Sequence, residues 1–228
     1  MGAIKAVLTG DLIQSRKLDN EGLEKVLNAL RHTFQEIQEK ILKSEGHFEI
    51  YRGDSFQLLL HEPQLALKVI LILKSRLRSL FAVKGSSEVK SDARMAIGIG
   101  TIRTQSFKII ESQGEAFELS GSEFDRMRKD SMSLSVRTPW EDVNEELRVN
   151  CLFADSTINS WSAKTAESAF RYLLYGETQE EQAKYFNVSQ PAISKRLFIQ
   201  GNMKAVDALL KRFENIIENH TNQISSGL

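Results

Sequence analysis

The sequence of 228 residues contains one cysteine and three prolines, and it carries no net charge because 30 basic residues balance 30 acidic ones. A single cysteine, Cys151, excludes a disulfide within this sequence and suits a reducing compartment. The balanced charge gives no general attraction to a polyanion. Any affinity for nucleic acid must therefore come from a local basic patch.

Long hydrophobic runs are also missing. The longest run, from Leu65 to Leu73, is interrupted by Lys68 and is too short to cross a bilayer. The first residues run directly into a strand-like segment, so no signal peptide is expected. We therefore expect a cytoplasmic protein without a membrane partner.

The first 138 residues contain short strand-like runs that alternate with amphipathic segments. The predicted strands are 3–9, 47–52, 55–60, 93–102, 107–111 and 133–136, and the predicted helices are 20–43, 64–81 and 118–129. This order predicts an α/β domain with a ferredoxin-like split βαβ sheet and helices on one face. Glycines in the 93–102 strand would let another backbone or a ligand approach the sheet.

The pattern changes after residue 138. Thr138, Pro139 and Glu141 are spaced as in a capping box with proline in the first turn, which predicts the start of a helix. No strand-like run follows as far as His220. We therefore predict a boundary near residue 139, between an α/β domain at 1–138 and an all-α domain at 139–228.

Two Gly-Asp pairs are the strongest candidates for a functional site in the first domain. Gly10-Asp11 ends the first strand, and Gly53-Asp54 lies between the two strands of a hairpin. The split βαβ order makes these strands neighbours, so the two carboxylates are expected to lie together as oxygen ligands for Mg²⁺ or Mn²⁺ bound to a polyphosphate. Gly-Asp is equally typical of a simple turn, and this alternative stays open.

These motifs have a familiar order along residues 3–136. Asp11-Leu12, Gly53-Asp54, the run Ile97–Gly100 and then Gly121 resemble the class III nucleotidyl cyclase fold, whose layout GGDEF domains and many polymerase palms share. The run from Gly10 to Arg16 (GDLIQSR) more specifically resembles the opening of the bacterial SatD-like family. The resemblance implies that Asp11, Asp54 and the carbonyl of Leu12 or Ile13 hold the metal.

The resemblance also implies positions for nucleotide contacts. Candidate phosphate ligands are Ser15, Arg16, Arg126 and Lys129. A surface ion pair for Arg16 and a merely solvated helix face for the others remain alternatives. The base-selecting position falls on Ile50, and a transition-state group falls near Asp125. Because Ile50 offers no hydrogen bond to a base and Asp125 adds negative charge where it already develops, we expect no cyclase turnover.

The segment 177–197 has the features of a helix-turn-helix. Thr178 and Glu181 form a capping box for a first helix, and Asn187 suits a left-handed turn. The second helix is predicted to present a polar outer face to the major groove of double-stranded DNA. The candidate DNA contacts are Ser189, Gln190, Ser194, Lys195 and Arg196.

The surrounding helices complete the predicted module. With a preceding helix at 163–175, the segment resembles the tri-helical DNA-binding modules of bacterial regulators and the last domain of sigma factors. A helical hairpin used only for packing or dimerisation is the alternative. The final helix, apolar on one side from Met203 to Ile217, is predicted either to pair with a second subunit or to pack on its own domain.

Together these patterns favour a DNA-binding transcriptional regulator. Its cyclase-like domain would bind a nucleotide with a metal or hold a homodimer together. The main alternative is a metal-dependent nucleotidyl cyclase or nucleotidyl transferase tethered to a DNA-binding module. A palm kept only as an assembly scaffold is a third possibility.

Overall fold

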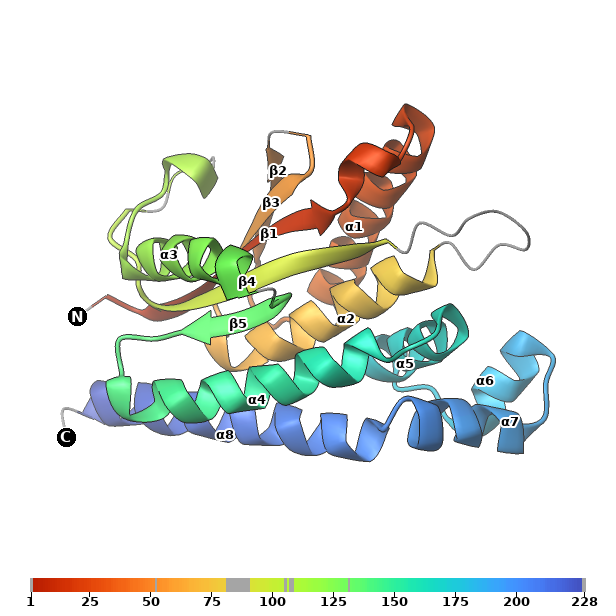
Figure 1. Ribbon diagram of the computed structural model, residues 1–228. Helices are drawn as coiled ribbons and strands as arrows, with labels where there is room; N and C mark the ends of the chain where they lie inside the picture. The colour runs from red at the N-terminus through yellow and green to blue at the C-terminus, as the bar shows by residue number, and fades with distance from the viewer. Residues whose placement is uncertain are drawn as a thin grey trace.

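A computed structural model of the chain describes residues 2–51, 53–80, 91–104, 106, 109–130 and 132–226. Its centre is a five-stranded sheet of order β2-β3-β1-β4-β5 (Figure 1). The strands are β1 (Ile4–Ile13), β2 (His47–Tyr51), β3 (Ser55–Leu60), β4 (Asp92–Thr101) and β5 (Leu134–Arg137). β4 and β5 are parallel, and the other neighbours are antiparallel. Because β3 lies between β1 and β2, the predicted split βαβ order is confirmed.

Helices surround this sheet and extend beyond it. The first three are α1 (Asn20–Lys40), α2 (Ala66–Ser79) and α3 (Glu115–Asp130). The next are α4 (Glu141–Asn159), α5 (Ala163–Tyr175), α6 (Gln179–Phe186) and α7 (Gln190–Ser194), which continues as the π-helical turn η4 (Lys195–Gln200) before α8 (Met203–Ser226). Short 3-10 turns are η1 (Ser15–Lys17), η2 (Pro63–Leu65) and η3 (Ile109–Glu111). No described helix combines the length and the apolar character that a membrane span requires.

The two faces of the sheet are covered differently, so the expectation of helices on one face is wrong. Leu8 of β1 belongs to the large core on the side of α1 and α2. Its neighbour Val7 points to the opposite face and packs with Ala116 of α3. A Cβ at Gly98 would lie 2.2 Å from the carbonyl oxygen of Ala116. The glycine in β4 therefore admits the backbone of α3 rather than a ligand.

Two local predictions fail for tertiary reasons. The described part of the predicted strand 107–111 is the 3-10 turn η3, whose Ile109 amide donates to Glu49 Oε2 at 2.8 Å; residues 107 and 108 lie outside the described residues. The predicted capping box at Thr138 is also absent. Helix α4 begins at Glu141 without a side-chain cap, because Thr138 instead bonds to Asn144, whose Oδ1 accepts from the Thr138 amide at 2.9 Å.

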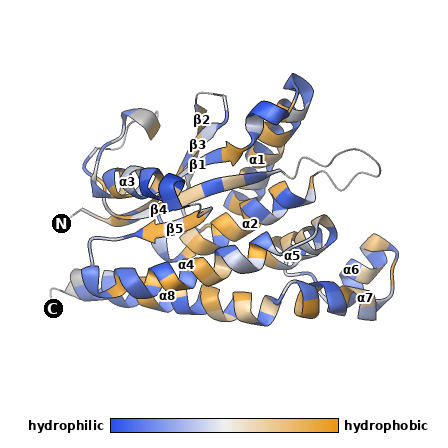
Figure 2. Cartoon of the chain, in the orientation of Figure 1, coloured by the Kyte–Doolittle hydropathy of each residue, from blue (hydrophilic) through white to orange (hydrophobic). Residues whose placement is uncertain are grey.

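The helices after residue 139 share the core of the sheet. One hydrophobic cluster contains Leu8 of β1, Leu71 of α2, Phe170 of α5 and Phe213 of α8. Along α4 and α8 apolar and polar residues alternate (Figure 2), and the apolar side of α8 is buried within its own chain. These side chains of α8 thus pack within this chain on residues from both sides of position 139, and its pairing with a second subunit stays a prediction. The boundary near residue 139 stays a prediction.

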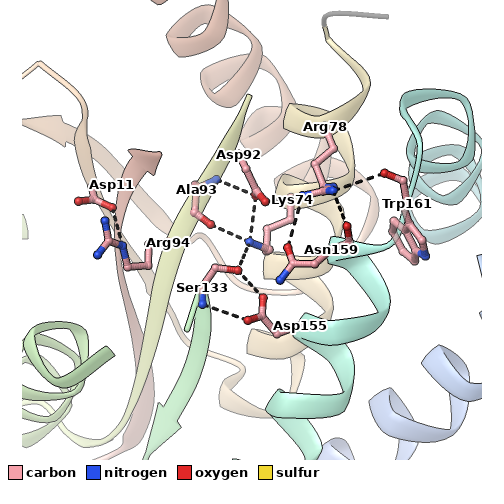
Figure 3. A network of polar contacts seen from close by, with 10 residues as sticks. All are labelled: Asp11, Lys74, Arg78, Asp92, Ala93, Arg94, Ser133, Asp155, Asn159 and Trp161. Carbon is pink, nitrogen blue, oxygen red and sulfur yellow. Dashed lines mark hydrogen bonds and ion pairs between the residues drawn. The ribbon is translucent and has the colours of Figure 1, made fainter. Parts of the chain in front are cut away.

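A buried polar network crosses from α2 to β4 (Figure 3). Lys74 of α2 is fully buried, and its Nζ donates to Asp92 Oδ1 at 2.9 Å, to the carbonyl of Ala93 at 2.7 Å and to Ser133 Oγ at 2.9 Å. These three acceptors satisfy all three donors of the ammonium group. The charge is therefore buried with partners, as a folded interior requires.

The same network continues into α4. The amide of Ser133 donates to Asp155 Oδ2 at 3.0 Å, and the Ser133 hydroxyl donates to the other carboxylate oxygen. Arg78 of α2 donates from Nη1 to Asp92 Oδ2 at 2.6 Å and from Nη2 to the carbonyl of Asn159 at 2.9 Å. Asp92 thus pairs with two cations, and removing Lys74 would leave this buried carboxylate with Arg78 alone.

The first prediction concerns Lys74. Lys74→Ala should lower the free energy of unfolding by about 3–5 kcal/mol, because Asp92 keeps its charge in a buried place while losing a partner. Lys68→Ala is the matched control on the same helix, at a partly exposed position, and should change it by less than about 0.5 kcal/mol. Urea unfolding followed by circular dichroism measures both. Equal effects of the two substitutions would contradict the role given to the network.

Candidate functional site

Asp11 lies near the end of the central strand β1, on the face that α3 covers. Its register partners are Ser55 of β3 and Arg94 of β4. Thr9, two residues earlier, points to the same face, where its hydroxyl lies 3.0 Å from the Ser120 hydroxyl of α3. The site is therefore held by three adjacent strands rather than by a loop alone.

Asp54 reaches this edge through the turn between β2 and β3. Gly53 has a φ of 80°, a left-handed value that favours glycine, and so allows the turn. The amide of Leu12 donates to the backbone carbonyl of Asp54 at 3.1 Å. The hydroxyl of Ser15 donates to Asp54 Oδ2 at 2.6 Å. The two Gly-Asp motifs and the start of η1 thus meet at one sheet edge, as the strand order led us to expect.

The carboxylate of Asp11 is incompletely satisfied. Its Oδ1 is buried and accepts no hydrogen bond, and it forms an ion pair with Arg94, whose Nε lies 3.5 Å away. Burial raises the pKa of Asp11 above its usual value; Arg94 and Arg128 oppose this shift and Asp54 adds to it. Asp11 therefore bears its negative charge at a cost to the folded state.

A divalent cation is chemically suited to this place. A buried carboxylate oxygen without a hydrogen bond, next to a second carboxylate, is a hard donor of the kind that Mg²⁺ and Mn²⁺ prefer. Within the described residues no group of three or more His, Cys, Asp or Glu side chains is arranged to hold a metal. Further ligands would come from backbone carbonyls, water or phosphate. The side chain of Leu12 is buried in the core, and the role of its carbonyl stays a prediction.

The predicted phosphate ligands are placed unequally. Ser15 is engaged with Asp54, and Arg16 is exposed in η1. Arg126 of α3 is paired with Glu123, with Nε and Nη2 donating at 3.0 and 2.6 Å. Lys129 is exposed on α3. Their role toward a nucleotide stays a prediction, and Arg126 would first have to leave Glu123.

Sequence reasoning did not connect two basic residues, Arg94 and Arg128, with Asp11. Arg94 could have been found, because an antiparallel pairing of the 93–102 strand with the first strand places a residue near its start opposite Asp11. Arg128 carries no such signal, since it is one of several charged residues in a short helical stretch. Which of these lies toward Asp11 depends on how α3 rotates on the sheet.

The expected base-selecting position lies on the other side of the sheet. Ile50 of β2 lines a cleft of about 280 Å³ with Phe34 and Phe48, and it packs against the core on the side of α1. Asp11 lies on the opposite face. Ile50 therefore places no group beside the two carboxylates.

The helices at 163–200 agree closely with their sequence signals. The capping box of Thr178 and Glu181 is present, and Asn187 is left-handed with φ 50° and ψ 50°. Helix α5 spans the predicted 163–175. Ser189 is the N-cap of α7, but its side chain forms no capping hydrogen bond.

The candidate DNA-contacting residues differ in exposure. Ser189 and Lys195 are exposed, and Ser194 is partly buried. The side-chain Nε2 of Gln190 donates to Gln179 Oε1 of α6. The guanidinium of Arg196 lies 5.2 Å from the ring centre of Phe186. The five residues thus include two that are already engaged by neighbouring side chains.

Comparison with known proteins adds only distant likenesses. No family model and no curated protein matches the sequence. The GGDEF domain of DgcB from Caulobacter crescentus in complex with c-di-GMP has a TM-score of 0.44 at 10% identity, covering 59% of this chain and 77% of that one. The active GGEEF domain of a diguanylate cyclase from Vibrio cholerae has a TM-score of 0.40 at 9% identity, covering 60% and 84%.

A bacterial light-regulated adenylyl cyclase is similar at the same level. Its TM-score is 0.43 at 14% identity, and the match covers 60% of this chain and 76% of that one. All three TM-scores are below 0.5, so these likenesses do not establish a family. The function has to be inferred from the residues of this chain.

The second prediction follows from the pKa of Asp11. The pKa of Asp11 is higher in the folded than in the unfolded chain. The free energy of unfolding therefore falls as the pH rises from the unfolded-state pKa to the folded-state pKa. Asp11→Asn removes the cost of the buried charge, so the variant should be more stable than the wild type at pH 7. The difference should vanish below about pH 4, where the unfolded carboxyl is also protonated.

Urea unfolding at pH 7 and at acidic pH measures this difference. Asp125→Asn, at an exposed position of α3, is the control and should show no such pH dependence. A less stable Asp11→Asn protein at pH 7 would contradict the interpretation.

Proposed function

We propose that this protein is a DNA-binding regulator that contacts the major groove of double-stranded DNA with α7, and that its sheet-edge carboxylates bind a nucleotide with Mg²⁺ or Mn²⁺. The observation that carries the DNA-binding part is the acid-free segment that runs from α7 through η4 to the start of α8 and exposes two lysines. Residues 189–204 include Lys195, Arg196 and Lys204 and no acidic residue. Lys195 and Lys204 are exposed, so both charges are available to phosphates.

Buried contacts hold α6, α7 and η4 against the rest of the chain. Gln182 of α6 is fully buried, and its amide donates to the carbonyl of Ser168 in α5 at 3.1 Å. Ile193 and Leu197 bury the inner side of the helical segment. In Figure 1, α6 and α7 lie at one end of the molecule, away from the sheet.

Two copies of the chain would suit an operator. A dimer that holds two α7 helices about 34 Å apart would reach successive major grooves on one side of the duplex. The modest basic charge of one module also favours two modules acting together. A homodimer is therefore part of the proposal.

The third prediction tests DNA binding. Purified protein should shift fragments of its own upstream region in a gel at low salt. Lys195→Ala should weaken binding to all sequences and reduce the salt dependence by about 0.9 in the log–log slope, as expected for one lost phosphate contact. Gln190→Ala should instead cost roughly 1–3 kcal/mol at one base pair if the side chain leaves Gln179 to read adenine.

Lys43→Ala is the matched control, because Lys43 is an exposed lysine near the end of α1, outside the proposed contact face. It should leave both affinity and salt dependence unchanged. The absence of any shift, or equal effects of Lys43→Ala and Lys195→Ala, would refute the proposed DNA-contact face.

The buried oxygen of Asp11 favours a second candidate function, metal-dependent nucleotidyl transfer. We expect the site to bind ATP or GTP without cyclising it. The expected base-selecting residue, Ile50, lies on the opposite face of the sheet, so it cannot contact a base held at the two carboxylates. ATP or GTP with Mg²⁺ or Mn²⁺ should raise the melting temperature of the wild type. Asp54→Asn should abolish this shift, whereas the control Glu118→Gln, at an exposed position of α3 with no role in the proposed site, should retain it. Metal-dependent cyclic product that disappears in Asp11→Ala would instead favour the enzyme.

A further inference from the structure

Arg94 is the one cation that the register of the sheet places directly opposite Asp11. Figure 3 shows its guanidinium beside the Asp11 carboxylate, on the far side of β4 from the Lys74 network. The side chains of Arg94 and Asp11 are only 24% and 15% exposed. This ion pair is therefore largely shielded from water, where charges attract more strongly than at a surface.

The geometry of the pair is nevertheless loose. Arg94 Nε lies 3.5 Å from Asp11 Oδ1, and that oxygen accepts no hydrogen bond. A guanidinium that formed two parallel hydrogen bonds with the carboxylate would hold it firmly. Here the attraction is electrostatic without those bonds, so another cation can replace Arg94 without breaking a hydrogen bond at Oδ1.

We propose that Arg94 is a built-in counter-ion for Asp11, and that a divalent cation binds at Asp11 and Asp54 by displacing it. The inference rests on the metal-binding part of the proposed function and deepens it. The displaced guanidinium remains permanently charged and becomes available to an anion. The preferred ligand is therefore a divalent cation that arrives with a polyphosphate. The negative phosphate can then pair with the positive guanidinium of Arg94 that the metal has displaced.

Arg128 offers a comparison within the same site. It also lowers the pKa of Asp11, but by less than Arg94 does, and it projects from α3 at an exposed position. Because Arg128 lies on a helix, no strand pairing holds it opposite Asp11 as the β1–β4 pairing holds Arg94. Removing its charge should therefore affect a metal at Asp11 less than removing the charge of Arg94.

The test measures Mn²⁺ binding to the full chain through the electron paramagnetic resonance signal of free Mn²⁺. Arg94→Gln should raise the affinity for Mn²⁺ alone by about tenfold or more, the scale expected when a nearby unit charge is removed. Arg94→Lys keeps the charge and should bind Mn²⁺ much as the wild type does. Arg128→Gln should change the affinity by a smaller factor than Arg94→Gln.

Inorganic triphosphate then tests the second half of the proposal. It should increase the Mn²⁺ affinity of the wild type strongly, and that of Arg94→Gln by a smaller factor. If Asp11→Asn abolishes Mn²⁺ binding but Arg94→Gln leaves it unchanged or weaker, the counter-ion role is wrong while the metal site stands. If neither the wild type nor Arg94→Gln binds Mn²⁺, both proposals fail. Circular dichroism of each variant identifies any loss of fold.

Discussion

The buried charge of Lys74 is the constraint on which the arrangement of the molecule depends. Its ammonium group must keep three partners, and these come from β4 and from the residue before β5. Ser133 in turn fixes α4 through Asp155. Just beyond the same end of α4, the indole of Trp161 donates to the carbonyl of Gly201 at 3.0 Å, where η4 ends. The proposed DNA-contacting segment is therefore positioned from the sheet.

On the face of the sheet that α3 covers, the buried charge is incompletely paired, and this is the basis of the candidate metal site. Lys74 has three hydrogen-bond acceptors, whereas Asp11 has a nearby guanidinium and an oxygen without a hydrogen bond. Proteins tolerate such incomplete pairing mainly where function requires it, because it lowers stability. At this sheet edge an incompletely paired carboxylate, Asp11, is held on rigid strands. Such a site is suited to exchanging the guanidinium of Arg94 for a metal cation.

Much of the fold could be predicted from local patterns, because periodicity and capping act over a few residues. The helix at 163–175 and the left-handed Asn187 are examples. Contacts between distant residues were not accessible in this way. Glycine at 98 could equally have admitted a ligand as α3, and nothing in the composition pairs Ser133 with Asp155. Arg94 was within reach of sequence reasoning through the antiparallel pairing of its strand with the first strand, whereas Arg128 depends on how α3 rotates on the sheet.

Hydrogen exchange tests most directly whether the sheet and the helices after residue 139 form one cooperative unit. If the Lys74 network and the shared core join them, the slowest amides of β4 and of α5 should exchange through the same global opening, with equal free energies. Mass spectrometry of the native protein across a low range of denaturant measures both segments in one experiment. Exchange of the α5 amides at a free energy several kcal/mol below that of β4 would contradict this unity, and would show that the helices unfold on their own.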